Sequence, residues 1–120
     1  MPDARFPVEM VGGVPVVATP EEIDITNADG LRMALLEAAG HRPGGFVVDM
    51  SRTQFCDTAG LHALVLAHKR ASDQGNEVRL VITGAAVLRI FAVTGLDDVI
   101  PQFASLEEAL AATSGSTEGN

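Results

Sequence analysis

A carboxylate and a hydroxyl stand side by side in the segment Asp57-Thr58-Ala59-Gly60, which is the part of the chain best suited to chemistry. The apolar stripe that begins at Leu61 predicts that a helix starts here, after a polar loop. A hydroxyl at a helix N-terminus lies near free amide donors and the positive end of the helix dipole, so a phosphate on it is tolerated. The spacing alone leaves two roles open for Thr58, a phosphate acceptor and a helix N-cap.

Three further side chains are candidates for a functional role. Asp24, like Asp57, is either a solvated loop acid or part of a site. His62 follows Thr58 by four residues, so the two share a helix face, and an interface or solvent role is favoured over catalysis. The acidic neighbourhood of Cys56 raises a thiol pKa, which favours a packing role over a nucleophile or a redox sensor.

Metal, cofactor and nucleic-acid sites are not indicated. His41, His62 and His68 lack metal-ligand spacing, and no Lys-Ser/Thr follows Gly12-Gly13 or Gly44-Gly45 as a phosphate-binding loop requires. A formal net charge of −8 disfavours nucleic acids and anionic membranes. Five Phe without Trp or Tyr argue against a base-stacking surface. We therefore expect neither a metal nor a cofactor, and no direct contact with nucleic acid or membrane.

The length and cysteine content indicate one small domain in a reducing compartment. A chain of 120 residues fits a single domain with its own core. Cys56 is the only cysteine, so an intrachain disulfide is excluded. The N-terminus lacks the layout of a signal peptide, and no apolar run reaches the roughly 18 residues of a membrane span. The expected location is the cytoplasm.

Apolar periods of two and of about 3.6 alternate along the chain. Strands are predicted in a hairpin around Gly12-Gly13 (Val8 to Val17), at Phe46–Met50, at Val78–Ile82 and around Val99 and Ile100. Helices are predicted from a Thr26 cap to Gly40, from Thr58 to Gln74, from Ala85 to Val93 with Leu88, Phe91 and Ala92 in the core, and from Ser105. This order predicts an α/β fold with a mixed, mostly parallel sheet, an N-terminal antiparallel hairpin and about four helices. The domain is expected to span residues 1–112, and the Ser/Thr/Gly-rich residues 113–120 to be a disordered tail.

The segment from Asp49 to Leu61 resembles the signature loop of the STAS family, the domain shared by anti-sigma factor antagonists and sulfate transporter tails. The matching positions are Asp49, Met50, Ser51, Phe55, Cys56, Asp57, Thr58, Ala59, Gly60 and Leu61. Further similarity lies in Glu22-Ile23-Asp24 with Thr26 and Leu31, and in Thr94-Gly95-Leu96. The resemblance extends to about Leu110. The chain departs from the family where Glu21 replaces a common Gly, and where the acceptor is Thr instead of the commoner Ser.

The resemblance implies a STAS-like domain that acts in partner switching and is not an enzyme. The unphosphorylated antagonist binds an anti-sigma factor serine/threonine kinase, a histidine-kinase-like ATPase, and so frees a sigma factor for transcription. The kinase phosphorylates the hydroxyl that matches Thr58, which breaks the complex, and a phosphatase resets the system. The resemblance places Asp24 near the acceptor loop, and the expected partner-binding residues are Asp24, Asp57, Thr58, Ala59, Gly60 and His62.

Two alternatives stay open at the level of the sequence. The chain could be a STAS subunit of another assembly, such as a stressosome-like or lipid-transport complex, that does not feed a sigma factor. A second alternative is a small enzyme that uses Cys56 or the acidic pair Asp24 and Asp57, although neither has a His or Lys nearby in the sequence.

Overall fold

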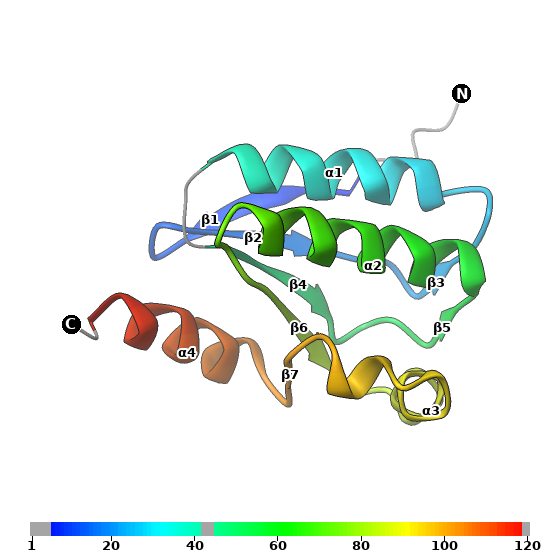
Figure 1. Ribbon diagram of the computed structural model, residues 1–120. Helices are drawn as coiled ribbons and strands as arrows, with labels where there is room; N and C mark the ends of the chain where they lie inside the picture. The colour runs from blue at the N-terminus through cyan, green and yellow to red at the C-terminus, as the bar shows by residue number, and fades with distance from the viewer. Residues whose placement is uncertain (1–5, 42–44, 119–120) are drawn as a thin grey trace.

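A five-stranded sheet forms the centre of the computed structural model, which describes residues 6–41 and 45–118 (Figure 1). The strand order is β1-β2-β4-β6-β7. These strands are β1 (Val8–Val11), β2 (Val14–Ala18), β4 (Phe46–Met50), β6 (Val78–Ile82) and β7 (Gln102–Phe103). β1 and β2 form the predicted antiparallel hairpin, and every other pair in the sheet is parallel. The predicted mixed, mostly parallel sheet is confirmed.

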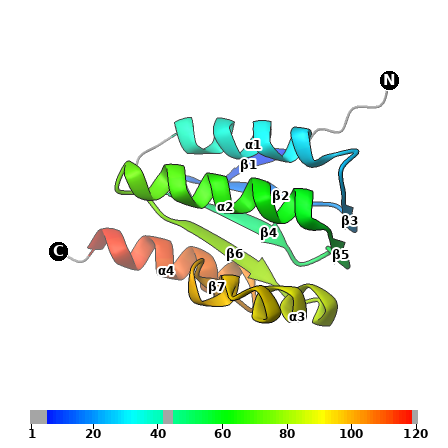
Figure 2. The ribbon, with the colours of Figure 1, turned by 45° about the vertical axis from the view of Figure 1, so that its right-hand side comes forward.

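Helices cover both faces of the sheet, as Figures 1 and 2 show. The helices are α1 (Ala28–His41), α2 (Thr58–Asp73), α3 (Ala85–Thr94) and α4 (Leu106–Glu118), and a 3₁₀ turn η1 spans Leu96–Asp98. Helices α1 and α2 lie together on one face and bury the larger core, which α3 completes. Helix α4 covers the other face with a smaller cluster around Ala109. The fold thus has three layers, and the helix count agrees with the prediction.

Strand β4, which begins with three apolar residues in a row, is the middle strand of the sheet. Phe46, Val48 and Met50 face the core under α1 and α2, while Val47 faces α4. All four side chains are at most 1% exposed. A strand covered on both faces needs no polar alternation, which explains the sequence pattern.

The start of α1 differs from the prediction by one or two residues. Thr26 does not cap the helix, because its hydroxyl and its amide both donate to Asp24 Oδ1. The Asp24 carbonyl accepts the amides of Asn27 and Ala28, so the first helical residue is Ala28. At the other end Gly40 lies within the helix, which continues to His41. Of the loop that the sequence predicts at Pro43-Gly44-Gly45, only Gly45 lies within the described residues.

Two predictions in the C-terminal third were wrong in detail. The strand expected around Val99 and Ile100 forms later, at β7, because both amides donate to the Leu96 carbonyl in the turn after α3. Phe91 is buried as predicted, but Leu88 and Ala92 are exposed, since the rotation of α3 turns Val87 inward together with Phe91.

The end of α4 lies beyond the predicted domain boundary at residue 112. Ser105 caps the helix as predicted, with its Oγ accepting the Glu108 amide at 3.1 Å. The helix runs to Glu118, so part of the segment predicted as a disordered tail is helical in the structure.

Candidate functional site

A second, two-stranded sheet brings two distant loops together at one end of the molecule. β3 (Glu22–Ile23) runs parallel to β5 (Phe55–Cys56), with Ile23 opposite Cys56. The next amide along, that of Asp57, donates to the Ile23 carbonyl at 3.0 Å. The residues that follow the two strands, Asp24 and Asp57, therefore lie on neighbouring segments of the chain. Both strands lie beside the start of α2 (Figure 1). The short strands are not evident from the sequence, because two residues show no period.

Asp57, rather than Thr58, caps α2. Its backbone is extended (φ −88°, ψ −175°), and its Oδ1 accepts the amides of Ala59 at 2.9 Å and Gly60 at 3.4 Å. A carboxylate in this position satisfies two amides that the helix leaves free and complements the helix dipole. The role of N-cap, which the sequence left open for Thr58, belongs to its neighbour.

Thr58 is the first helical residue and is exposed to solvent. Within the part of the chain that the structure describes, its hydroxyl has no hydrogen-bond partner. His62 is also exposed, one turn further along the same helix, as predicted from the spacing of four residues. Thr58 thus presents a hydroxyl that can be modified without breaking a contact in the fold.

Asp24 is an ionised acceptor at the edge of this site. The Thr26 hydroxyl donates to its carboxylate and the Thr26 amide does so at 2.9 Å, and these bonds lower the Asp24 pKa from its ordinary value of 3.8. A carboxylate held ionised in this way is a poor general acid. Since Asp57 is also engaged as a cap, both members of the acidic pair have structural partners, which argues against the enzyme alternative.

Gly60 and Cys56 form a close helix-to-strand contact inside the site. Gly60 is buried, and a Cβ on it would lie 2.6 Å from Ile23 Cγ2 and 2.7 Å from Cys56 Sγ. Cys56 is 1% exposed, and its burial, with a smaller effect of the Asp57 charge, raises the thiol pKa to about 12. The thiol is therefore protonated at neutral pH and is no nucleophile. The predicted packing role of Cys56 is confirmed.

Buried hydroxyls anchor the loop that leads to the site. Thr53 Oγ1 lies 2.6 Å from Thr19 Oγ1 and 2.7 Å from the Pro20 carbonyl, and both threonine side chains are at most 3% exposed. The amides of Gln54 and Phe55 donate to the Glu21 carbonyl. These bonds tie the loop to the end of β2, so the backbone before Thr58 is held in one geometry.

The sequence pattern of the STAS domain matches residues 5–109 of the chain. The chain belongs to the STAS domain family. Anti-sigma-F factor antagonist RsfB of Mycobacterium tuberculosis is 29% identical over 103 residues, which cover 86% of this chain and 84% of RsfB. A crystal structure of an anti-sigma factor antagonist from Mycobacterium paratuberculosis matches with a TM-score of 0.82 and 30% identity, over 91% of this chain and 92% of that one.

The fold is shared more widely than the sequence. The anti-sigma factor antagonist SpoIIAA in its unphosphorylated form matches with a TM-score of 0.69 over 96% of this chain and 99% of its own. Its identity is 16%, so the likeness concerns the fold. The sequence-based prediction of a single STAS-like α/β domain is thus confirmed by both kinds of comparison.

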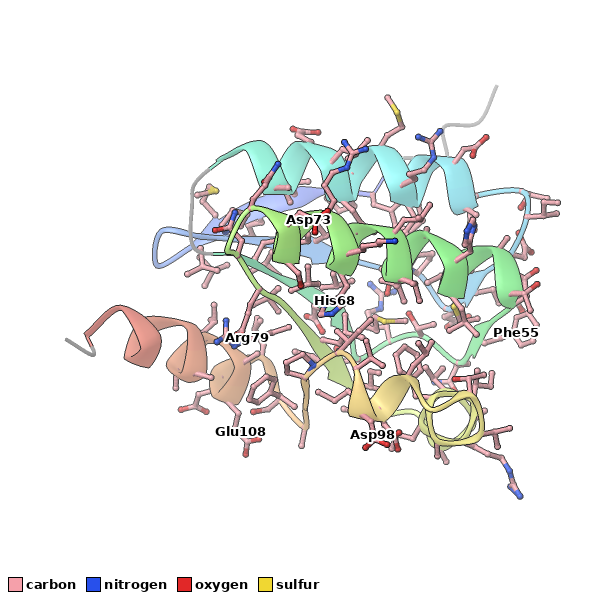
Figure 3. All side chains as sticks on the ribbon, in the orientation of Figure 1. Phe55, His68, Asp73, Arg79, Asp98 and Glu108 are labelled. Atoms are coloured by element: carbon pink, nitrogen blue, oxygen red, sulfur yellow. The ribbon has the colours of Figure 1, made fainter. Side chains whose placement is uncertain are left out.

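The candidate site also includes an apolar residue that the sequence patterns did not indicate. Ile25 is 79% exposed and lines a shallow hollow of about 200 Å³ between the starts of α1 and α2. Ala59, His62 and Leu66 line the same hollow from α2. The sequence feature that could have indicated Ile25 is its position: it is a large aliphatic residue in the loop after Asp24 and does not belong to the apolar stripe of the following helix. The candidate site therefore combines a free hydroxyl, two carboxylates and an exposed apolar side chain (the exposed ring of Phe55 lies at the same end, Figure 3).

Metal clusters and membrane-spanning helices are two further features that would indicate a different function for the STAS domain. Among the described residues, no group of three or more His, Cys, Asp and Glu side chains is arranged to hold a metal ion. None of the helices in those residues combines the length and hydropathy needed to cross a membrane.

Proposed function

We propose that this STAS protein is an anti-sigma factor antagonist that acts by partner switching. In its unphosphorylated form it binds an anti-sigma factor kinase of the histidine-kinase-like ATPase type, and the sigma factor is released. The kinase transfers the γ-phosphoryl group of ATP to Thr58 Oγ1, so that an O–P bond forms, ADP leaves and the hydroxyl proton is lost. A phosphatase hydrolyses the phosphothreonine and restores the binding form.

The position of Thr58 carries this proposal. Its hydroxyl is exposed and without a partner in the described fold, while Asp57 performs the capping that a threonine at a helix start would otherwise perform. Thr53 in the same loop is less suited as an acceptor, because it is fully buried and bonded to Thr19. The names of the relatives, RsfB among them, support the antagonist role.

A phosphate on Thr58 opposes binding more than it opposes folding. It adds about −1.5 to −2 charges beside Asp57 and Asp24, at a surface that solvent screens in the free protein. In a complex the same group must be desolvated or must hold the partner away, which costs several kcal/mol. A loss of about 4 kcal/mol corresponds to roughly a thousandfold in affinity. The modified protein should therefore stay folded and lose its partner.

Kinase assays and binding measurements test the proposal together. The protein is incubated with its cognate kinase and ATP, and the modified residue is mapped by mass spectrometry. We expect phosphate at Thr58, none on Thr58→Ala, and retained kinase binding by Thr58→Ala. Thr58→Glu should bind weakly and still unfold cooperatively.

Ser72 offers a matched control on the same helix. It is exposed near the other end of α2, roughly 20 Å from Thr58 at 1.5 Å per residue. Ser72→Glu adds the same charge and should bind as the wild type does. Labelling of Thr58→Ala to the wild-type extent, or equal loss of binding by both Glu variants, would show that Thr58 is not the switch. Recovery of a transporter component instead of a kinase in a pull-down from native lysate would favour the alternative assembly.

A further inference from the structure

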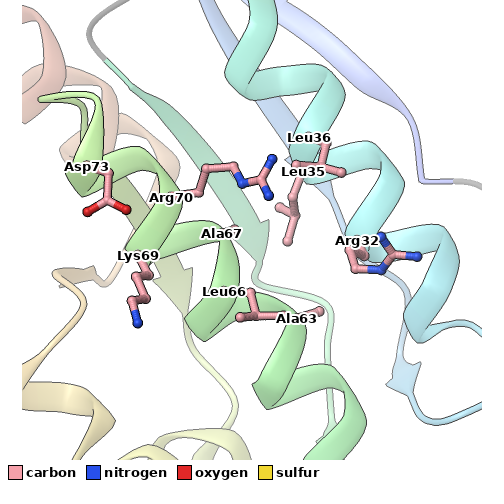
Figure 4. Close-up of a pocket in the computed structure, with 9 residues that line it drawn as sticks. All are labelled: Arg32, Leu35, Leu36, Ala63, Leu66, Ala67, Lys69, Arg70 and Asp73. Carbon is pink, nitrogen blue, oxygen red and sulfur yellow. The ribbon is translucent and has the colours of Figure 1, made fainter.

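The groove between α1 and α2 runs away from Thr58 along the outer face of the domain. It has a volume of about 300 Å³ and is lined by Arg32, Leu35, Leu36, Ala63, Leu66, Ala67, Lys69, Arg70 and Asp73 (Figure 4). Its first part shares Arg32, Ala63 and Leu66 with the hollow beside Ile25, so the two form one trough. The six residues expected to contact the kinase do not line the larger groove, although Leu66 lines both hollows.

The walls of this groove are apolar but remain open to solvent. Leu36 from α1 is 37% exposed and Leu66 from α2 is 43% exposed, while Leu35 between them is buried. Ala63 and Ala67 present only methyl groups at the α2 wall, which leaves room between the two helices. An apolar trough of this kind, flanked by polar side chains, is suited to the apolar stripe of another helix.

The charge of the groove is opposite to the charge of the molecule. The chain has a formal net charge of −8 and eight Lys and Arg residues, of which three line this groove. Asp73 is the one carboxylate among the described lining residues. Arg32 also pairs with Asp29 at 3.8 Å, but both side chains are well exposed, and such a pair contributes little and is readily exchanged. Arg70 extends from α2 toward α1 (Figure 4).

We propose that this groove binds an amphipathic helix of a protein partner in which acidic residues flank an apolar stripe. The stripe contacts Leu36 and Leu66, and the carboxylates pair with Arg32 and Arg70 across the two walls. Outside the groove the chain carries 15 of its 16 Asp and Glu residues but only five of its eight Lys and Arg residues, a balance that repels such a helix. The groove is therefore the site at which attraction and apolar contact coincide. The same net charge opposes adsorption to an anionic membrane, which would also seek basic and apolar residues.

A labelled peptide of defined sequence tests the groove directly and stands in for the helix of the partner. The probe is a fluorescein-labelled helical peptide of about 18 residues, about 27 Å long, with Leu on one face and Glu on both flanks. A peptide with the same composition but shuffled positions has no apolar stripe. Fluorescence anisotropy should show saturable binding of the first peptide, weakened by salt, and no binding of the shuffled one.

Two pairs of variants locate the binding surface. We expect Arg70→Glu to weaken binding about fivefold to tenfold, and Leu66→Ser about tenfold. Arg89→Glu and Leu88→Ser make the same changes on α3, where Arg89 is exposed and Leu88 is 41% exposed, and should change binding less than about twofold. Thr58→Glu should also bind the peptide normally, which separates this site from the proposed switch.

Several results would overturn the proposal. Absence of saturable binding, equal binding of the shuffled peptide, or equal losses in the α3 variants would each exclude a specific helix site. Loss of peptide binding in Thr58→Glu would show that the groove is not separate from the switch. Binding of phosphatidylserine vesicles through Arg70 and Leu66, without binding of the peptide, would assign the groove to a membrane instead.

Discussion

Replacing Gly60 by Ala tests whether this residue of the signature segment serves packing. The new methyl group would lie 2.6 Å from Ile23 Cγ2 and 2.7 Å from Cys56 Sγ, where ordinary contacts are about 3.5–4.0 Å. The helix and β3 or β5 must separate by nearly 1 Å, or side chains must leave their rotamers, which costs about 1–3 kcal/mol. Ala gains up to about 1 kcal/mol over Gly in a helix interior, and only part of this gain applies to Gly60 in the first turn of α2. We therefore expect a net loss of about 1–2 kcal/mol in the free energy of unfolding.

Chemical and thermal denaturation monitored by circular dichroism measure this change. For a domain of this size the expected loss lowers the melting temperature by about 4–10 °C. Gly40→Ala is the matched control, because Gly40 lies in α1 with nothing within 4 Å of an added Cβ, and it should leave stability unchanged or slightly higher. The reasoning is refuted if Gly60→Ala is as stable as the wild type. A partner-binding role alone would give that result together with weaker kinase binding.

Three further predictions concern the buried thiol, the loop anchor and the tail. The pKa of Cys56 is raised from 9.0 to about 12 in the folded protein, so the thiol ionises first in the unfolded state. The free energy of unfolding should therefore be highest below pH 9 and fall between pH 9 and pH 12. Cys56→Ala should flatten this fall in urea titrations, and the chain has no Tyr and a single Lys whose ionisation could obscure the effect. Thr53→Val removes a buried, bonded hydroxyl and should lower the free energy of unfolding by about 1–2 kcal/mol. Thr83→Val removes an exposed hydroxyl and should lower it by less than about 0.5 kcal/mol, with both values measured from urea midpoints. Deletion of residues 113–120 should lower the melting temperature by less than about 3 °C, since the segment has no large apolar side chain to bury, and a larger drop would show that it docks.

The central elements could be predicted from the sequence because their signals are local and strong. The bounds of β4 and β6 were predicted to the residue, since each is an apolar run with a single charged residue, Asp49 or Arg79, and is flanked by loop-forming residues. The start of α1 was misplaced because Thr26 and Asn27 are both good caps, and the choice between them depends on bonds to Asp24. The pairing of β3 with β5 depends wholly on contacts across the chain, so no pattern within two residues could predict it.

The sequence located the segments of the candidate site but did not show which of their side chains point into the domain and which point to solvent. The spacing of Asp57 and Thr58 located the helix start, but the capping role depends on which side chain turns back to the free amides. Gly60 was included among the expected partner contacts, but the structure places it inside the domain. A glycine in a sequence does not reveal whether a partner or a side chain of the same domain packs against it. Ile25 was missed because a single aliphatic residue in a loop looks the same whether it is packed or exposed.

The identity of the cap determines what a modification of Thr58 can do to the protein. If Thr58 capped α2, its phosphorylation would disturb the bonds to the first amides and cost the fold about 0.5–2 kcal/mol. Asp57 holds the amides of Ala59 and Gly60 instead, so the helix start keeps its bonds whether or not the neighbouring hydroxyl is modified. The remaining cost to the fold is repulsion between the phosphate and the carboxylates of Asp24 and Asp57, which water and salt reduce at an exposed site. In a complex that screening is lost, so the same charge acts mainly on binding. This division of roles between two adjacent residues would let the proposed switch act on binding at little cost to a marginally stable fold.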